Sequence, residues 1–290
     1  SASNKVYDGS SAATVTLSLS GFIGSETVTS TNSSTFSDKN VASGKTVTVN
    51  SITLADGSNG GLAANYSISA GQTTTANITA KSLTVSGITA SNKIYDGNGV
   101  ATLDASSVAY SGLVSGDTFN GTFIGAFSDK NVGTGKTVTI TPSYSGADVN
   151  NYSITNHADV TANITAKALT VSGVTASDKT YDGGTTATTT LTFTGLIGSE
   201  TLGQTVGSTF DNKNVGSNKS VSVNSITLAD GSGLAANYSI SAGQTTTANI
   251  TAKSLTVSGI TASNKTYDGN GVATLDASSV AYSGIVSGDT

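Results

Sequence analysis

The residues with the clearest chemical potential lie in a signature, Lys-x-Tyr-Asp-Gly, that occurs four times. A lysine, a phenol and a carboxylate this close together could bind a ligand, and that alternative stays open. The structural interpretation is favoured, because tyrosine combines an apolar ring with one hydroxyl, aspartate accepts hydrogen bonds from following amides, and glycine allows positive φ. The signature therefore predicts a corner that ends a strand. Its members are Lys5, Tyr7, Asp8, Gly9, Lys93, Tyr95, Asp96, Gly97, Lys179, Tyr181, Asp182, Gly183, Lys265, Tyr267, Asp268 and Gly269.

Other combinations that could do chemistry are weak. His157 is the single histidine, and the aligned segments of the other copies have no counterpart, which favours an exposed turn over a Ser-His-Asp site. Half of the aspartates lie in Asp-Gly or Asp-Lys-Asn turns, and no D-x-D-x-D calcium loop occurs. We therefore expect no catalytic residue, no metal ligand and no cofactor. Calcium at a joint between copies stays an open alternative.

A lysine–asparagine isopeptide crosslink is a further hypothesis, because both residue types recur at matched positions. Such a bond needs a buried lysine beside an asparagine and a carboxyl group. Most of these lysines lie in turns rich in Gly, Asn and Asp, which predicts exposure instead. An intact mass lower by about 17 Da per bond, the loss of one ammonia, would reveal the crosslink.

Composition excludes several classes of protein. The 290 residues carry a net charge of −5 and include no Cys, and all 13 basic residues are Lys. Disulfides and thiolate metal sites are therefore excluded. An acidic chain without Arg lacks the basic face that binds nucleic acid. The longest apolar runs have two or three residues, so no membrane insertion is expected.

The apolar residues follow the period of a β-strand. Val47 and Val49 alternate with Thr46 and Thr48, and similar Thr- and Val-rich alternation recurs along the chain. A hydrophobic content of 36% with a small net charge argues against disorder. Within 47–54 the apolar positions shift by one residue, which predicts a bulge or bend, or two separate strands.

Tandem repetition sets the domain organisation. Successive Tyr-Asp-Gly triplets are 88, 86 and 86 residues apart. Three further landmarks recur with them, the motifs Phe-Ser-Asp-Lys-Asn-Val, Asn-Tyr-Ser-Ile and Ala-Asn-Ile-Thr-Ala-Lys, and alternate copies are the most alike. Placing boundaries beside Lys81, Lys167 and Lys253 predicts a copy at 1–81 without its first strand, complete copies at 82–167 and 168–253, and a partial copy at 254–290.

These patterns predict an all-β chain, a tandem elongated array of small β-sandwich modules of about 86 residues, either Ig-like or β-grasp-like. No polar linker separates the copies, because Ala-Lys-Ser/Ala-Leu-Thr runs directly from a closing strand into an opening one. We therefore expect tight joints with little hinge motion.

The landmarks also resemble a known family. Leu-Thr-Val-Ser-Gly-Ile-Thr-Ala-Ser-Asn-Lys-Ile-Tyr-Asp-Gly (83–97), Gly-Leu-Val-Ser-Gly-Asp (112–117), Phe-Ser-Asp-Lys-Asn-Val (127–132) and Asn-Tyr-Ser-Ile (151–154) are similar to the YDG repeat of large bacterial surface proteins, including filamentous-haemagglutinin-like adhesins. The third copy departs at Asp211 and Asn212. Copies one and three have Gly-Ser-Glu-Thr where the second has Ser-Gly-Asp-Thr. The resemblance implies an extracellular β stalk module and transfers no catalytic residue.

The functional expectation is a non-enzymatic structural stalk or fibre segment of a secreted bacterial surface adhesin, which extends a binding region away from the cell. One alternative is a subunit of an extracellular filament joined by strand complementation. Another is a carbohydrate- or calcium-binding module array. The expected partners are neighbouring modules, like molecules in a filament, and a glycan or protein receptor bound through other regions.

Overall fold

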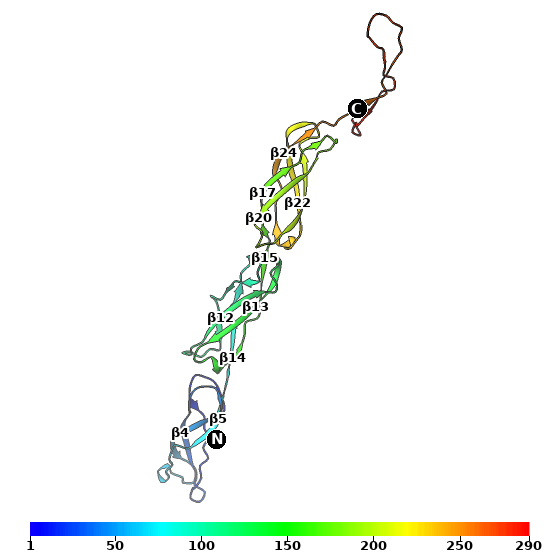
Figure 1. Cartoon of the computed structure of the whole chain (residues 1–290). Coiled ribbons are helices and arrows are strands. Elements are labelled where there is room, and N and C mark those ends of the chain that lie inside the picture. The colour runs from blue at the N-terminus through cyan, green and yellow to red at the C-terminus, as the bar shows by residue number, and fades with distance from the viewer. Residues whose placement is uncertain (290) are drawn as a thin grey trace. The chain divides into compact units, whose positions relative to one another are not determined.

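Strands form nearly all of the regular structure. The computed structural model describes residues 1–289, so Thr290, the last residue of the expected partial copy 254–290, lies outside the described residues. The regular elements of the described part are β-strands and three short 3₁₀ helices (Figure 1). The alternation seen in the sequence produces them, since Val47 and Val49 are buried while Thr46 is exposed. The prediction of an all-β array of small modules is confirmed.

The first copy is built on one five-stranded sheet. Its order is β1-β5-β4-β3-β2, with β1 parallel to β5 and the other neighbours antiparallel. The elements are β1 (Lys5–Val6), β2 (Ala12–Ala13), β3 (Val28–Phe36), β4 (Ala42–Asp56), the 3₁₀ helix η1 (Ala63–Asn65) and β5 (Thr73–Thr79).

The predicted irregularity within 47–54 is a bulge in a single long strand. Ser33 pairs with Ser51 and Ser34 with Val49, so Asn50 of β4 is the extra residue. The extra residue moves the following side chains to the opposite face, which explains the shift of the apolar positions from Val49 to Ile52. The alternative of two separate strands is wrong.

The second copy carries two layers of strands. Strands β15, β13, β12 and β9 neighbour one another in one sheet, while β11, β6 and β14 form a separate three-stranded sheet. The elements are β6 (Lys81–Ser86), β7 (Thr89–Ala90), β8 (Lys93–Ile94), β9 (Val100–Ala101), β10 (Leu103–Asp104), β11 (Ala109–Ser111), β12 (Asn120–Phe127), β13 (Gly133–Ser145), η2 (Val149–Asn151), β14 (Tyr152–Thr155) and β15 (Val160–Thr165).

The third copy repeats the five-stranded sheet, in the order β18-β24-β22-β21-β19. Its elements are β16 (Lys167–Ala168), β17 (Thr170–Ala176), β18 (Lys179–Thr180), β19 (Thr186–Ala187), β20 (Thr189–Thr194), β21 (Leu202–Phe210), β22 (Gly216–Asp230), η3 (Ala235–Asn237), β23 (Tyr238–Ser239) and β24 (Thr245–Thr251). The remainder contains two antiparallel strand pairs, β25 (Thr256–Ser258) with β28 (Ala281–Ser283) and, between them in the sequence, β26 (Thr261–Ala262) with β27 (Leu275–Asp276).

The first two copies share one hydrophobic core. Strand β5 ends at Thr79 and β6 begins at Lys81, so one residue separates the two sheets. Tyr7 of the first copy and Leu83 and Tyr152 of the second belong to the same cluster of buried side chains. The chain therefore passes from one copy to the next through packed structure and not through a solvated linker.

The compact units of the chain do not coincide with the repeats. One unit comprises residues 1–93 and 99–163, and the other comprises residues 94–98 and the chain from 164 onward. The second Tyr-Asp-Gly corner, 95–97, is therefore grouped with the copy that follows it. The first corner also lies in one unit with its following copy.

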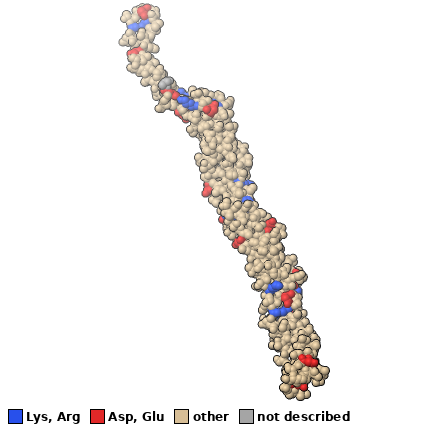
Figure 2. Space-filling view, turned by 180° about the vertical axis from the view of Figure 1, so that it is seen from behind, with Lys and Arg blue, Asp and Glu red and all other residues tan. Residues whose placement is uncertain are grey.

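The surface offers few charges. Figure 2 shows lysines and acids sparsely scattered over the visible face, with both signs interspersed. Among residues 1–289 no helix has the length and apolar character needed to cross a membrane.

Candidate functional site

The lysine of the signature closes the turn that follows it. Lys5 Nζ donates to Asp8 Oδ1 at 2.7 Å and to the carbonyl oxygens of Ser10 and Ala12 at 2.8 and 3.1 Å. The same ammonium lies 5.7 Å from the centre of the Phe36 ring, within cation–π range. The equivalent lysines repeat parts of this arrangement: Lys179 with Asp182 and Phe210, Lys265 with Asp268, and Lys93 with the carbonyl of Val100 and the ring of Phe127.

The aspartate stabilises the same turn. Asp8 Oδ1 accepts a hydrogen bond from the backbone N–H of Ser10 at 2.8 Å, which is an Asx-turn. Burial alone would raise the pKa of Asp8, but the hydrogen bonds from Lys5 and Ser10 outweigh it and hold that pKa below its usual value. This local geometry is what the structural interpretation of the signature requires.

The tyrosine of the signature contacts the following copy. The Tyr7 hydroxyl donates to Asp117 Oδ1 at 3.0 Å, and the Tyr152 hydroxyl donates to Asp117 Oδ2 at 2.5 Å. The two rings meet edge to face, with centroids 5.6 Å apart and an interplanar angle of 78°. Two phenols from successive copies thus converge on one carboxylate, and this edge-to-face geometry is favourable for aromatic pairs.

The second junction repeats the arrangement with a glutamate. Tyr95 donates to Glu200 Oε1 at 2.7 Å and Tyr238 donates to Oε2 at 2.6 Å, with the ring centroids 5.4 Å apart. We call each such set, the signature tyrosine, the Asn-Tyr-Ser-Ile tyrosine and the acid between them, a junction clamp. The two complete clamps are Tyr7/Asp117/Tyr152 and Tyr95/Glu200/Tyr238.

Two separate constraints, backbone conformation and space, require glycine at this position of the signature. Gly97 has φ of +82°, and a Cβ there would lie 2.7 Å from Cγ2 of Ile197, three positions before the acid. A side chain would be strained by the backbone and would also strike the following copy. Gly9 meets Val114 and Gly183 meets Val286 in the same way, whereas a Cβ on Gly269 would have nothing within 4 Å.

The remaining positions hold parts of a clamp. Tyr181 donates to Asp289 at 3.0 Å. Tyr66 donates to Glu26 at 2.6 Å, beside Ile23, which is 75% exposed. Tyr267, the signature tyrosine of the last copy, is 93% exposed. Of the signature tyrosines, Tyr7 and Tyr95 are therefore buried in complete clamps, Tyr181 is half-buried in an open one, and Tyr267 contacts no following copy in the described residues.

Comparison with known families agrees with this repetition. The YDG domain profile matches residues 1–76, 79–162 and 165–248. The chain belongs to the YDG domain family. Neither the curated proteins nor the solved structures contain a match to it. In the first three copies the Tyr and Gly that give the YDG domain its name face the following copy, while the Asp stabilises the turn.

A lysine adds charge to the clamp between the first two YDG modules. Lys39 Nζ lies 3.1 Å from Asp117 Oδ1 and 2.8 Å from Asp148 Oδ1, and 5.9 Å from the centre of the Tyr7 ring. The hydrogen bonds to Asp148 and Asp117 raise the pKa of Lys39, which stays charged. Lys213 occupies the matching position beside Asp289, at 3.4 Å, and Tyr181.

The contacts in the clamps shift the pKa values of the tyrosines and of the acid that form them. Burial, together with the hydrogen bond to the carboxylate, raises the pKa values of Tyr95, Tyr152 and Tyr238 to about 12. Burial also acts to raise the pKa of Asp117, but hydrogen bonds from Tyr152, Lys39 and Tyr7 outweigh it and lower that pKa. At neutral pH the Asp117 clamp is therefore an ionised acid that accepts from neutral phenols.

This predicts a broad pH plateau in the stability of the YDG modules. Because the pKa of folded Asp117 is lowered, its contribution is present above about pH 4, the unfolded value, and is lost as the pH falls through the folded value. Because the tyrosine pKa values are raised, their contribution is present below about pH 10 and is lost as the pH rises toward 12. Urea midpoints across pH 3–11 should be flat between roughly 5 and 9. Midpoints that rise above pH 10 would contradict the clamp.

Sequence reasoning assigned no role to the acids or to the second tyrosine of each clamp. The missed residues are Glu26, Asp117, Glu200 and Asp289, with Tyr66, Tyr152 and Tyr238. One signal was present, because Glu26 and Glu200 are the only glutamates and stand at the same position of alternate modules. Nothing in one module's sequence shows that this acid faces another module.

The remaining candidates for chemistry are the single histidine and a possible metal site. His157 is partly exposed in the loop between β14 and β15, as expected for a turn histidine, with Nδ1 2.6 Å from the carbonyl oxygen of Ala158. Within residues 1–289 no group of three or more His, Cys, Asp or Glu is arranged to hold a metal ion.

One lysine lies beside an asparagine and an acid, as an isopeptide bond requires, but the acid is ionised. Lys219 Nζ lies 2.7 Å from Asn212 Oδ1 and 2.8 Å from Asp211 Oδ1, and its side chain is 9% exposed. Crosslinking requires an uncharged amine and a protonated acid. Here the hydrogen bond from Lys219 lowers the pKa of Asp211, which keeps the acid ionised. The geometry is that of an ion pair between a largely buried lysine and a half-exposed aspartate, so the predicted exposure is wrong for this lysine.

Proposed function

We propose that this chain is a structural stalk segment of a secreted bacterial surface adhesin, in which YDG modules hold a binding region away from the cell. The observation that carries the proposal is the junction clamp, which connects successive modules through buried side chains. Tyr7 and Tyr95 are each 1% exposed, so these contacts are core contacts. A residue buried to this degree resists the bending that would bring it into water.

The chemistry of the clamp suits this role. A bend at the first junction would separate Tyr7 from Asp117 and expose two aromatic rings, so it costs both hydrogen bonds and apolar burial. In the first clamp the acid is ionised and the phenols are neutral near neutral pH, so the hydrogen bonds between them are kept there.

Small-angle X-ray scattering tests the proposal directly. We expect the full chain to have a maximum dimension typical of modules arranged end to end. The Glu200→Ala variant, which opens the second clamp, should show a broader distribution of distances. Glu26→Ala provides the matched control, because the Glu26–Tyr66 bond lies within a single module. A compact, near-spherical wild-type particle would contradict the stalk function.

Assembly into a filament by strand complementation stays a prediction. The carbohydrate- or calcium-binding alternative stays a prediction. A thermal-shift screen with calcium and glycans tests it, because a ligand that binds the native state raises the melting temperature.

A further inference from the structure

A nearly continuous strand carries the chain out of the first module and into the second. Strand β5 lies between β1 and β4, and β6, which follows after one residue, lies between β11 and β14. All of these strands belong to the same compact unit. The chain therefore has strand neighbours on both sides just before and just after Ala80. Tension on the chain passes through this segment, because the backbone is the covalent connection between the two modules.

The direction of strand pairing decides how such tension acts on a module. We call β1 and β18, which lead into Tyr-Asp-Gly, signature strands, and β5 and β24, the last strands of the first and third modules, closing strands. In the first module the two are parallel neighbours, with Lys5 opposite Ile78 and Val6 opposite Thr79. The N-terminal end of the signature strand and the C-terminal end of the closing strand therefore lie at opposite ends of the pair. Tension between these ends makes the strands slide along each other and strains all hydrogen bonds between them together.

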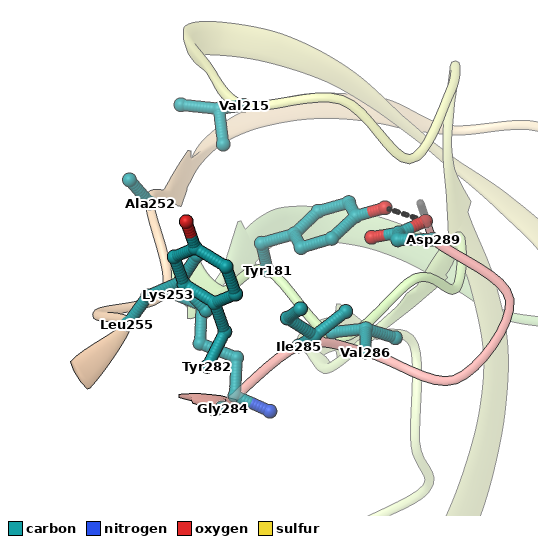
Figure 3. A pocket seen from close by; sticks show the side chains of 10 residues that line it. All are labelled: Tyr181, Val215, Ala252, Lys253, Leu255, Tyr282, Gly284, Ile285, Val286 and Asp289. Atoms are coloured by element: carbon teal, nitrogen blue, oxygen red, sulfur yellow. Dashed lines mark hydrogen bonds between the residues drawn. The ribbon is translucent and has the colours of Figure 1, made fainter. Parts of the chain in front are cut away.

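The third module repeats the arrangement in the other compact unit. Its closing strand β24 lies between β18 and β22, and β18 pairs with it in parallel. The backbone N–H of Tyr181 donates to the carbonyl oxygen of Thr251 at 2.9 Å, while its hydroxyl donates to Asp289 (Figure 3). In the first module the N–H of Tyr7 donates to the carbonyl oxygen of Thr79, also at 2.9 Å. The signature tyrosine thus holds the closing strand of its own module through its backbone and contacts the following copy through its side chain.

A side chain just before each signature lysine adds a further contact to the last strand of the module. In the first three copies this residue accepts a hydrogen bond, through Oδ1, from the backbone N–H of an asparagine in that strand. The pairs are Asn4 with Asn77 at 2.7 Å, Asn92 with Asn163 at 2.7 Å and Asp178 with Asn249 at 2.6 Å. We call the three acceptors fastening residues. Their hydrogen bonds connect the two segments that tension would slide past each other.

Sliding would also move buried side chains. Ile78 of β5 and Ile250 of β24 are each 1% exposed, and Leu83 of β6 is fully buried. A shift of register by one residue would turn such side chains to the outer face of the sheet and bring them into water. Apolar packing and hydrogen bonds therefore resist the same movement.

We propose that the YDG modules of this chain resist tension between the chain ends, and that sliding of the closing strand against the signature strand is the step that limits their unfolding under force. Residues 73–86 transmit the tension from the first module to the second, and the fastening residues delay the sliding. This goes beyond the stalk function, because a spacer has to keep its length, whereas a tensile element also has to stay folded when it is pulled. It does not depend on where the protein is located.

Single-molecule force spectroscopy of the full chain tests the direction of resistance. The sequence contains no cysteine, so two introduced cysteines provide unique points of attachment. Handles at the two chain ends make the strands slide. The pair Ser43→Cys and Ala80→Cys instead attaches the handles at the same end of the antiparallel neighbours β4 and β5, where Ala42 lies opposite Ile78, so that the hydrogen bonds open one after another.

We expect the second geometry to unfold the first module at a force several-fold lower than any module requires in the end-to-end geometry. Its unfolding step is identified by a gain in length of about 13 nm, at about 3.5 Å for each released residue. An equal or higher force between residues 43 and 80 would overturn the proposal.

A variant without the fastening contacts tests their part in the resistance. Asn4→Ala, Asn92→Ala and Asp178→Ala together remove one acceptor from each of the first three copies. At constant end-to-end force we expect the lifetimes of the folded modules to shorten roughly three- to tenfold, the effect of one hydrogen bond. Unchanged lifetimes would contradict the fastening function.

The matched control removes side-chain hydrogen bonds away from the closing strands. Asn50 donates to Thr35 between β4 and β3, and Asn224 donates to Thr209 between β22 and β21, each at 3.0 Å. The double variant Asn50→Ala and Asn224→Ala should therefore keep the lifetimes of the wild type under force. Circular dichroism of both variants checks that they fold. Equal shortening of the lifetimes in the two variants would mean that the fastening residues act on general stability and not on sliding.

If scattering shows an extended chain but the unfolding force is the same in both geometries, the stalk function stands and this inference fails. If the chain is compact but resists end-to-end tension more than opening between residues 43 and 80, the reverse holds. The two experiments therefore separate the proposed function from the resistance to tension.

Discussion

Replacing Gly97 by valine is expected to destabilise the second junction by about 3 kcal/mol, the sum of backbone strain and overpacking. Gly97 has φ of +82°, where a β-branched residue is disfavoured by about 1–2 kcal/mol. Its Cβ would lie 2.7 Å from Ile197 Cγ2, and this clash adds about 1–3 kcal/mol. The Tyr95 and Glu200 groups next to it should then separate.

Gly269→Val is the matched control. Gly269 occupies the same corner with φ of +78°, but a Cβ there would have nothing within 4 Å. This variant should be destabilised only by the backbone strain. The difference between the two variants therefore measures the contact with the following module and cancels the conformational cost of replacing glycine.

Amide hydrogen exchange gives the measurement, because it reports local opening. The Tyr95 N–H donates to the carbonyl of Thr165 at 2.8 Å and lies next to the clamp. Its protection should fall sharply in Gly97→Val and stay unchanged in Gly269→Val. Equal effects of the two substitutions would mean that the glycine is needed for the turn and not for the junction.

The fold class could be predicted because its signals are local. Alternation of valine with threonine, and a shift of that alternation between Val49 and Ile52, are properties of a few consecutive residues. In the structure the alternation corresponds to a strand, and its shift corresponds to a bulge in that strand. The turn function of Asp8 could be predicted for the same reason, since an Asx-turn involves residues two positions apart.

The junction clamp could not be predicted in this way. Tyr7 and Asp117 are 110 residues apart, and each is compatible with a purely local function. Repetition itself conceals the pairing, because identical landmarks in every module do not show whether a tyrosine contacts its own module or the next. Only the spatial order of the modules distinguishes Asp117 from Glu26 as the partner of Tyr7.

The same limit applies to the lysine of the signature. Lys5 and Asp8 form an ion pair at 2.7 Å, which the interpretation of the signature as a strand-ending corner did not include. The ring beneath it, Phe36, belongs to a different landmark and is brought there by the pairing of β2 with β3. Two motifs that recur together along the chain are thus two sides of one contact.

Glu200→Ala is expected to destabilise the second junction strongly. Glu200 accepts hydrogen bonds from Tyr95 and Tyr238, and hydrogen bonds to a charged group are each worth about 1.5–3 kcal/mol. Removing the carboxylate leaves two largely buried hydroxyls without their acceptor. We therefore expect a loss of about 3–5 kcal/mol at the second junction, from two such bonds.

Glu26→Ala separates this effect from the general cost of losing a glutamate. Glu26 stands at the equivalent position of the first module and accepts from Tyr66. Its removal should therefore cost about half as much, since one tyrosine bond is lost instead of two. Glu200→Gln keeps one acceptor oxygen and should fall between the wild type and Glu200→Ala.

Two matched amides report the outcome. Ile197 N–H donates to the Tyr238 hydroxyl at 3.0 Å, and Ile23 N–H donates to the Tyr66 hydroxyl at 3.2 Å. Exchange at Ile197 should accelerate more in Glu200→Ala than exchange at Ile23 does in Glu26→Ala. Adding Tyr95→Phe to Glu200→Ala should then recover part of the loss, because the unpaired hydroxyl is removed with its desolvation penalty. If the two losses are equal and Tyr95→Phe is simply additive, Tyr95 does not depend on Glu200, and the clamp does not couple one module to the next.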